Sequence, residues 1–112
     1  MKKIEAIIKP FKLDDVKASL GAIDTTGLTV TEVSGCGLQG LCDDLYRSSS
    51  GAQDSAPKVK LEVITEDDKA GQVASAIERA ARTGREGDGT ITILPVDEVV
   101  RVRTGERGVA AV

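Results

Sequence analysis

The residues of this chain best suited to chemistry are a glycine-flanked aspartate and a pair of arginines near its end. Gly87-Asp88-Gly89 is a turn sequence, and Arg101 and Arg103 follow it with one residue between them. Glycines accept positive φ, so the turn can arrange backbone N–H groups into a nest of phosphate size. In a strand, residues two apart lie on one face, roughly 7 Å apart, so both guanidinium groups can reach one multiply charged ligand.

Each of these features also has an ordinary structural explanation. A Gly-Asp-Gly sequence is often only a hairpin turn, and an Arg-x-Arg sequence is often a solvated strand face. If residues 99–103 form a strand, Val100 and Val102 should face the core. The turn and the arginines together favour a ligand that carries phosphate.

The composition limits the classes of protein to which the chain can belong. With 112 residues, 40% of them apolar and 29% charged, residues 1–112 should fold as a single domain. The net charge of −3 opposes nucleic-acid binding that neutralises many phosphates. No apolar run is long enough to span a membrane, and lysines at positions 2 and 3 oppose a signal peptide, so we expect a cytoplasmic protein with no transmembrane segment.

Missing and rare residue types narrow the chemistry further. The chain has no histidine, which excludes Ser-His-Asp and Cys-His catalysis and His-ligated metals, and we expect no catalytic residue and no protein-held metal. Cys36 and Cys42 are separated by five residues; two free thiols are expected, with a redox-responsive loop as the alternative. Phe11 and Tyr46 are the two aromatic residues, so the core should be aliphatic.

The hydrophobic pattern predicts a strand, a helix and a second strand in the first third of the chain. Residues 2–9 alternate between apolar and polar up to Pro10, residues 13–23 repeat apolar side chains at helical spacing, and residues 28–35 are rich in β-branched residues. Residues 36–56 then lack any period. A loop of this length is usually functional or disordered, so a ligand-gated or partner-binding arm is favoured over an insertion without consequence.

The rest of the chain predicts the same order of elements again. Residues 58–64 alternate strictly, residues 70–81 have helical spacing, residues 91–96 form a strand, and residues 99–103 a short fifth strand. This order predicts an α+β, ferredoxin-like split βαβ fold (βαββαβ), with two helices on one face of an antiparallel sheet. We expect the uncovered face to be aliphatic and to mediate assembly.

Seven segments of the chain together resemble the PII signal-transduction proteins. They are residues 7–16 (IIKPFKLDDV), 29–33 (TVTEV), 35–39 (GCGLQ), 45–47 (LYR), 57–62 (PKVKLE), 83–89 (TGREGDG) and 100–106 (VRVRTGE). The resemblance implies a ferredoxin-like homotrimer that binds adenine nucleotide (ADP, AMP or ATP) in the clefts between subunits. It further implies that 2-oxoglutarate joins ATP through Mg²⁺, which is expected with ATP only, and that a long T-loop, about residues 37–55, regulates a partner protein.

The resemblance also assigns ligand roles to individual positions. The nucleotide-binding positions that it implies are Thr29, Gly35, Gly37, Lys58, Glu62, Ile64, Gly87, Asp88, Gly89, Thr90, Arg101 and Arg103. Gln39 and Lys58 match the metabolite-binding residues of the family. Ile64 should line the adenine pocket, and the two arginines should hold phosphates from across the subunit cleft.

Three positions depart from the family pattern. Gly51 replaces a tyrosine, which rules out uridylylation there, and Gly40 replaces a basic residue. Thr90 replaces a phosphate-binding lysine, which predicts that ADP or AMP competes unusually well with ATP. Serines 48–50 leave phosphorylation open, so these features indicate a divergent PII-like protein with an altered T-loop.

Hypotheses of different classes follow from these observations. The first is a non-enzymatic sensor in which nucleotide and a small metabolite act through the T-loop, with inorganic carbon (bicarbonate) in a carbon-acquisition setting as the metabolite. Its alternative is a conventional nitrogen-regulatory PII protein that senses ATP, ADP and 2-oxoglutarate. A slow nucleotide hydrolase with Asp88 or Glu62 as the base is disfavoured, because the chain has no histidine and no Walker lysine motif.

Overall fold

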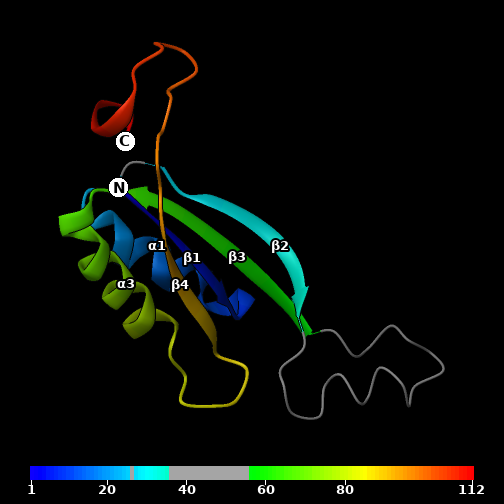
Figure 1. Cartoon of the computed structure of the whole chain (residues 1–112). Helices are drawn as coiled ribbons and strands as arrows, with labels where there is room; N and C mark the ends of the chain where they lie inside the picture. The colour runs from blue at the N-terminus through cyan, green and yellow to red at the C-terminus, as the bar shows by residue number, and fades with distance from the viewer. Residues whose placement is uncertain (26, 36–55) are drawn as a thin grey trace.

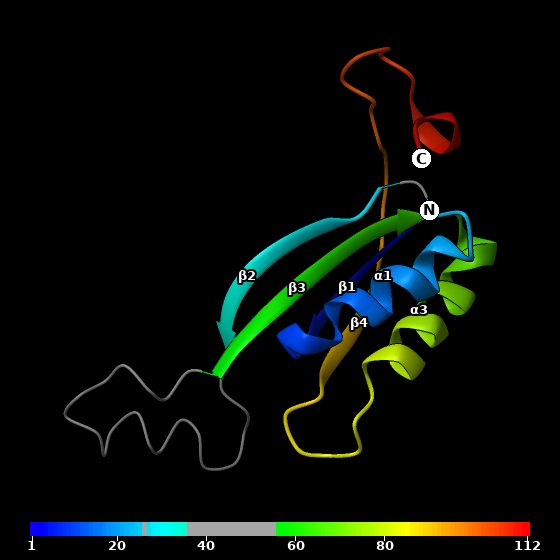
Figure 2. The ribbon, with the colours of Figure 1, turned by 180° about the vertical axis from the view of Figure 1, so that it is seen from behind.

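A four-stranded antiparallel sheet with two helices on one side forms the body of the protein (Figures 1 and 2). The computed structural model describes residues 1–25, 27–35 and 56–112. In chain order, its elements are β1 (Lys2–Ile8), the 3-10 helix η1 (Pro10–Lys12), α1 (Leu13–Gly21), β2 (Thr29–Gly35), β3 (Ala56–Thr65), α3 (Asp67–Ala81), β4 (Gly89–Pro95) and the 3-10 helix η2 (Gly108–Ala111). The strand order β2-β3-β1-β4 confirms the predicted α+β ferredoxin-like fold. The predicted T-loop, about residues 37–55, lies outside the described residues.

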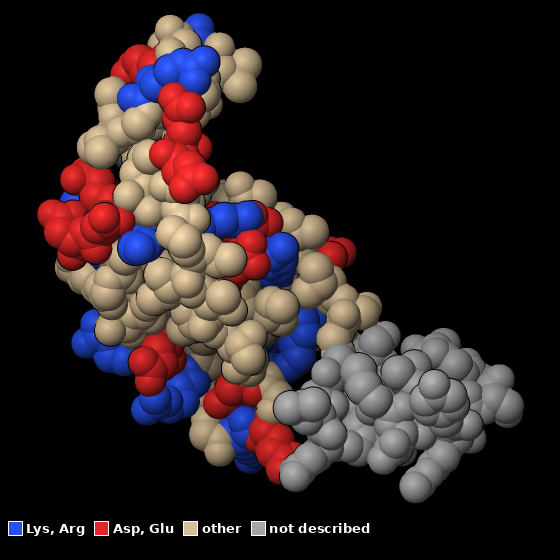
Figure 3. Space-filling view, viewed as in Figure 1, with Lys and Arg blue, Asp and Glu red and all other residues tan. Residues whose placement is uncertain are grey.

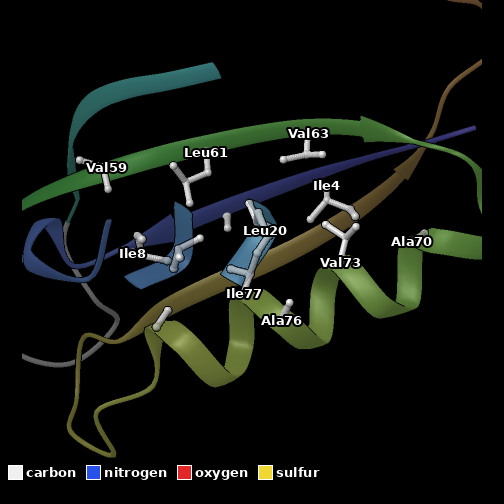
Figure 4. Packing of buried hydrophobic residues seen from close by; sticks show 13 residues of the cluster. Ile4, Ile8, Leu20, Val59, Leu61, Val63, Ala70, Val73, Ala76 and Ile77 are labelled. Atoms are coloured by element: carbon white, nitrogen blue, oxygen red, sulfur yellow. The ribbon is translucent and has the colours of Figure 1, made fainter. Parts of the chain in front are cut away.

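The core lies between the sheet and the two helices and is aliphatic, as the composition predicts (Figure 4). β1 alternates strictly and buries Ile4, Ala6 and Ile8 against the helices. From the other side, α1 contributes Val16 and Leu20, and α3 contributes an alanine-rich face. Small side chains on α3 let this helix approach the sheet closely, so thirteen buried apolar residues of the described chain make a continuous core without an aromatic ring.

The uncovered face of the sheet differs from the prediction. Because Ile4, Ala6 and Ile8 point toward the helices, the odd-numbered residues of β1 point away from them. The register opposes Glu5 with Glu62 and places Lys3 and Lys60 beside them, so charged side chains occupy the middle of this face. The expectation of an aliphatic sheet face was therefore wrong. Figure 3 shows basic and acidic side chains interspersed rather than gathered by sign.

The predicted fifth strand, residues 99–103, is not formed in the described part of the chain. β4 ends at Pro95, which has no N–H to continue the ladder, and Val96 N makes a last hydrogen bond of 3.1 Å to Met1 O. The chain then leaves the sheet as a hairpin joined by a bridge between Val100 and Arg107 (Figure 1). Val102 is 98% exposed, so it faces solvent rather than the core. The alternation of valine and arginine resembles a strand, but no strand of the described sheet pairs with it.

None of the helices among the described residues is both long and apolar enough to cross a membrane.

Candidate functional site

Asp88 stabilises the turn that joins α3 to β4 by accepting hydrogen bonds within it. Its carboxylate accepts hydrogen bonds from Thr83 N and Gly84 N, each at 2.9 Å, and from the Thr83 hydroxyl. Lys9 Nζ lies 3.1 Å from Asp88 Oδ1. The hydrogen bond from the Thr83 hydroxyl, followed by the other donors, holds the pKa of Asp88 well below its ordinary range. The carboxylate is therefore ionised, and its oxygens accept hydrogen bonds from the backbone and side chain of the same turn.

The two glycines beside Asp88 take the positive φ angles that the sequence predicts. Gly87 has φ +82° and Gly89 has φ +112°. A Cβ atom at Gly89 would lie 1.7 Å from Ile7 O, because β4 begins there against the end of β1. Glycine at position 89 is therefore required both by the backbone conformation and by the close approach of the two strands.

Two lysines contact the turn, Lys9 just after β1 and Lys58 in β3. Lys58 Nζ donates a hydrogen bond to Gly87 O, and Lys9 Nζ donates to Thr83 Oγ1 at 3.2 Å. Partial burial, followed by the positive charge of Lys9, lowers the pKa of Lys58, while the nearby Asp88 carboxylate opposes this shift. The structure therefore places two cations next to the Gly87–Gly89 turn, which suits an anionic ligand.

Lys9 contacts this turn, and the sequence analysis did not identify it as a candidate site residue. In the sequence it stands before Pro10 and is easily taken for the last residue of a strand. The register pairs Ile8, the last residue of β1, with Val59, so Lys9, which follows it, comes level with Lys58. An antiparallel alignment of residues 2–9 with 58–64 would have found it.

Three predicted nucleotide positions meet in a cleft at the other end of β3. Thr29 of β2 pairs directly with Glu62, and Ile64 follows two residues later on the same face. A cavity of about 270 Å³ is lined by these three side chains together with Lys3, Gly27, Val99, Ala111 and Val112. The lining of this cleft thus combines apolar side chains with a threonine, a glutamate and a lysine.

An ion-pair network occupies the polar side of this cleft. Lys3 Nζ lies 2.7 Å from Glu62 Oε2 and 2.9 Å from Glu5 Oε1. Lys60 Nζ lies farther from the same carboxylates, at 3.7 Å from Glu62 and 3.9 Å from Glu5. The hydrogen bond between Lys3 and Glu62 raises the pKa of Lys3 and lowers the pKa of Glu62. Both groups are thus held in their charged forms.

The structure does not bring the turn and the cleft together within one chain. Lys58 and Ile64 are six residues apart on an extended strand, roughly 20 Å. Figure 1 shows the loop before β4 and the C-terminal hairpin at opposite ends of the molecule. Arg101, whose guanidinium lies 3.8 Å from Glu106, belongs to that distant hairpin. Within one chain, the turn and the hairpin that carries the two arginines therefore lie far apart.

The remaining predicted positions divide between the same two ends. Gly35 closes β2 beside the Lys58 side chain, and Thr90 lines a hollow of about 340 Å³ with Asp88 and Gly89. Arg103 lies in the turn of the C-terminal hairpin. Gly37 and Gln39 lie outside the described residues.

Comparisons with known proteins agree on one family. A sequence model described as "Nitrogen regulatory protein P-II" matches residues 1–106. Curated relatives of that name are 55% identical over 108 residues in Azospirillum brasilense, 53% over 112 residues in Rhizobium meliloti and 52% over 108 residues in Rhodospirillum rubrum. The alignments cover 96–100% of this chain and of each relative.

Proposed function

Since the chain belongs to the P-II family of nitrogen regulatory proteins, we propose that it is a cytoplasmic, non-enzymatic signalling protein that reports nitrogen status to a partner protein. Adenine nucleotide is the proposed ligand, bound between the subunits of a homotrimer. The names of the relatives favour this nitrogen-regulatory alternative over the bicarbonate hypothesis, and nothing among the described residues supports bicarbonate.

The observation that carries the proposal is the separation of the two groups of candidate residues. The cleft around Thr29, Glu62 and Ile64 lies at one end of β3, and the turn with its two lysines lies at the other. In a cyclic assembly, each copy presents one surface to its neighbour and a different surface to the copy behind it. A chain with two separated half-sites can therefore complete one nucleotide site at every interface of a ring.

The charges of the two half-sites suit a nucleotide. Lys9, Lys58 and the Gly87–Gly89 turn supply positive charge for phosphates, while the cleft offers apolar walls and a polar edge for a base. The described residues contain no group of three acidic, cysteine or histidine side chains placed to hold a metal. In the proposal, Mg²⁺ therefore enters with the phosphates of ATP, which is also where 2-oxoglutarate would join it.

The electrostatics oppose the hydrolase hypothesis. A general base works best when its pKa lies near the operating pH. The pKa of Asp88 and the pKa of Glu62 are both lowered, by the Thr83 hydroxyl and by Lys3 respectively. Neither carboxylate suits the abstraction of a proton from water.

A mixing experiment tests the shared site. Thr29→Arg fills the cleft, and Lys58→Glu reverses the charge at the turn, so each homogeneous variant should bind no ADP by calorimetry. Random co-assembly of the two variants should restore about one quarter of the sites, because an interface can take one intact half from each copy. Lys9→Glu mixed with Lys58→Glu is the matched control and should restore none. No recovery in the first mixture would contradict a site between subunits.

A further inference from the structure

The C-terminal segment forms one side of the cleft that holds Thr29, Glu62 and Ile64. Ala111 and Val112 line the cavity, and neither comes from the sheet on which the other side is built. Both residues also lie beyond residue 106, where the match to the family model ends. The family model does not reach these two residues, although the alignment with the Rhizobium meliloti relative covers the whole chain.

Hydrogen bonds fix the segment in this position. Gly108 N donates to Val99 O at 3.0 Å, so η2 begins beside the first leg of the C-terminal hairpin. Arg107 Nη1 lies 2.9 Å from Glu98 Oε1 and joins the same two legs. Val112 N closes η2 with a hydrogen bond of 3.1 Å to Val109 O. The return of the hairpin therefore carries Ala111 and Val112 back to the sheet.

Val112 also lines a second cavity next to the cleft. Ile64 and Val112 line both the cleft and a neighbouring hollow of about 180 Å³ that contains Thr65 and Lys69. The two apolar side chains thus belong to the lining of both cavities.

We propose that Ala111 and Val112 are ligand-contacting residues that form the apolar wall against which the base of a bound adenine nucleotide packs. A purine has flat apolar faces and a polar edge, which matches a cleft whose lining combines the apolar Val112 with the polar Thr29 and Glu62. The inference rests on the proposed nucleotide-binding function. It adds that the return leg of the hairpin contacts the base, while the turn of that hairpin carries Arg101 and Arg103.

Calorimetric titration with AMP, ADP and ATP tests the wall. Val112→Ser should weaken all three by about 3- to 10-fold, because part of an apolar contact is lost and the number of phosphates does not matter. Val112→Ile keeps the apolar contact and should bind within about 2-fold of the wild type. Val109→Ser is the matched control on the same element: Val109 is 58% exposed and does not line the cleft, so binding should not change.

A second measurement separates contact from a general loosening of the segment. In the wild-type chain saturated with ADP, Val112 methyl groups should show intermolecular NOEs to the adenine ring protons, and Val109 methyl groups should show none. The proposed contact between Val112 and the adenine base would be overturned if Val112→Ser bound the nucleotides as tightly as the wild type or more tightly. It would also be overturned if those NOEs were absent. A wild-type chain that binds none of the three nucleotides would overturn the proposed function as well, so the two failures are distinguishable.

Discussion

The two half-sites at the ends of β3 are held together differently. The turn near Lys58 depends on backbone geometry, whereas the cleft near Ile64 depends on contacts between side chains. The turn depends on two glycines with positive φ, on a close approach to Ile7 O, and on backbone N–H groups that bind Asp88. The cleft depends on ion pairs between neighbouring side chains on an open sheet face, with Lys3 shared by two carboxylates.

This difference indicates how each half-site responds to substitution. Backbone geometry tolerates few residue types, because a Cβ atom or a lost acceptor disturbs the chain itself. Partly exposed ion pairs are screened by solvent and individually contribute little to stability. We therefore expect substitutions of the glycines and of Asp88 in the turn to affect folding, and substitutions in the cleft to affect mainly ligand binding.

Gly89→Ala should have the largest effect. The new Cβ atom collides with Ile7 O, so the free energy of unfolding should fall by about 3 kcal/mol or more, measured by urea denaturation. Gly84→Ala is the matched control, since Gly84 also has positive φ but a Cβ atom there would meet nothing within 4 Å, and it should lose about 1 kcal/mol. Equal losses in the two variants would show that the close approach at Gly89 is not what fixes the turn.

Thr90→Lys should change the choice of nucleotide. Thr90 is exposed beside the turn, and a lysine there adds a cation for the outer phosphates. A charged hydrogen bond contributes about 1.5–3 kcal/mol, so ATP binding should tighten by roughly 10- to 150-fold, with a smaller gain for AMP. Titrations of wild type and variant with each nucleotide measure this. If the wild type already prefers ATP strongly over ADP, the predicted competition by ADP or AMP is wrong.

Asp88→Asn should flatten the acid dependence of stability. The folded pKa of Asp88 is depressed, so its contribution is fully present above the unfolded pKa, about 3.9, and is lost as pH falls through the lower folded pKa. The variant lacks this contribution and should be less stable at neutral pH but less sensitive to acid. Thermal midpoints between pH 2 and 7 measure the effect, and Asp97→Asn, in an exposed segment, serves as the control. If the thermal midpoints of wild type and Asp88→Asn depend on pH in the same way, the ionised Asp88 carboxylate does not stabilise the turn.

Lys3→Met should give the smallest effect on stability and a clear electrostatic one. Removal of the hydrogen bond from Lys3 should raise the pKa of Glu62 toward its ordinary value, less than fully because Lys60 remains nearby. Carboxyl carbon shifts in an NMR titration report this pKa directly. Lys2→Met alters the neighbouring residue, which points to the opposite face of β1, and should leave Glu62 unchanged. A Glu62 pKa that does not move would mean that the side chains are not paired in solution.

Local pattern was sufficient for much of this protein. The loose alternation of residues 2–9, the strict alternation of residues 58–64 and the helical spacing of residues 70–81 predicted the elements, because burial on one face dictates their period. Gly87 and Gly89 predicted positive φ angles because glycine lacks the Cβ atom that makes this conformation unfavourable for other residues. The order of segments such as residues 7–16 and 83–89 was enough to indicate the family.

The tertiary structure decided which of these local features meet. Residues 99–103 alternate like a strand, but strand formation needs a pairing partner, and the chain leaves the sheet after Pro95. The hydrogen bonds from Thr83 and Gly84 to the Asp88 carboxylate join residues that the fold of the turn brings together. Strand register and the path of the chain decide three further contacts: Lys9 with the turn, Lys3 with Glu62, and Val112 with the cleft. Contacts between residues far apart in sequence are set by the packing of the whole chain, which no single segment encodes.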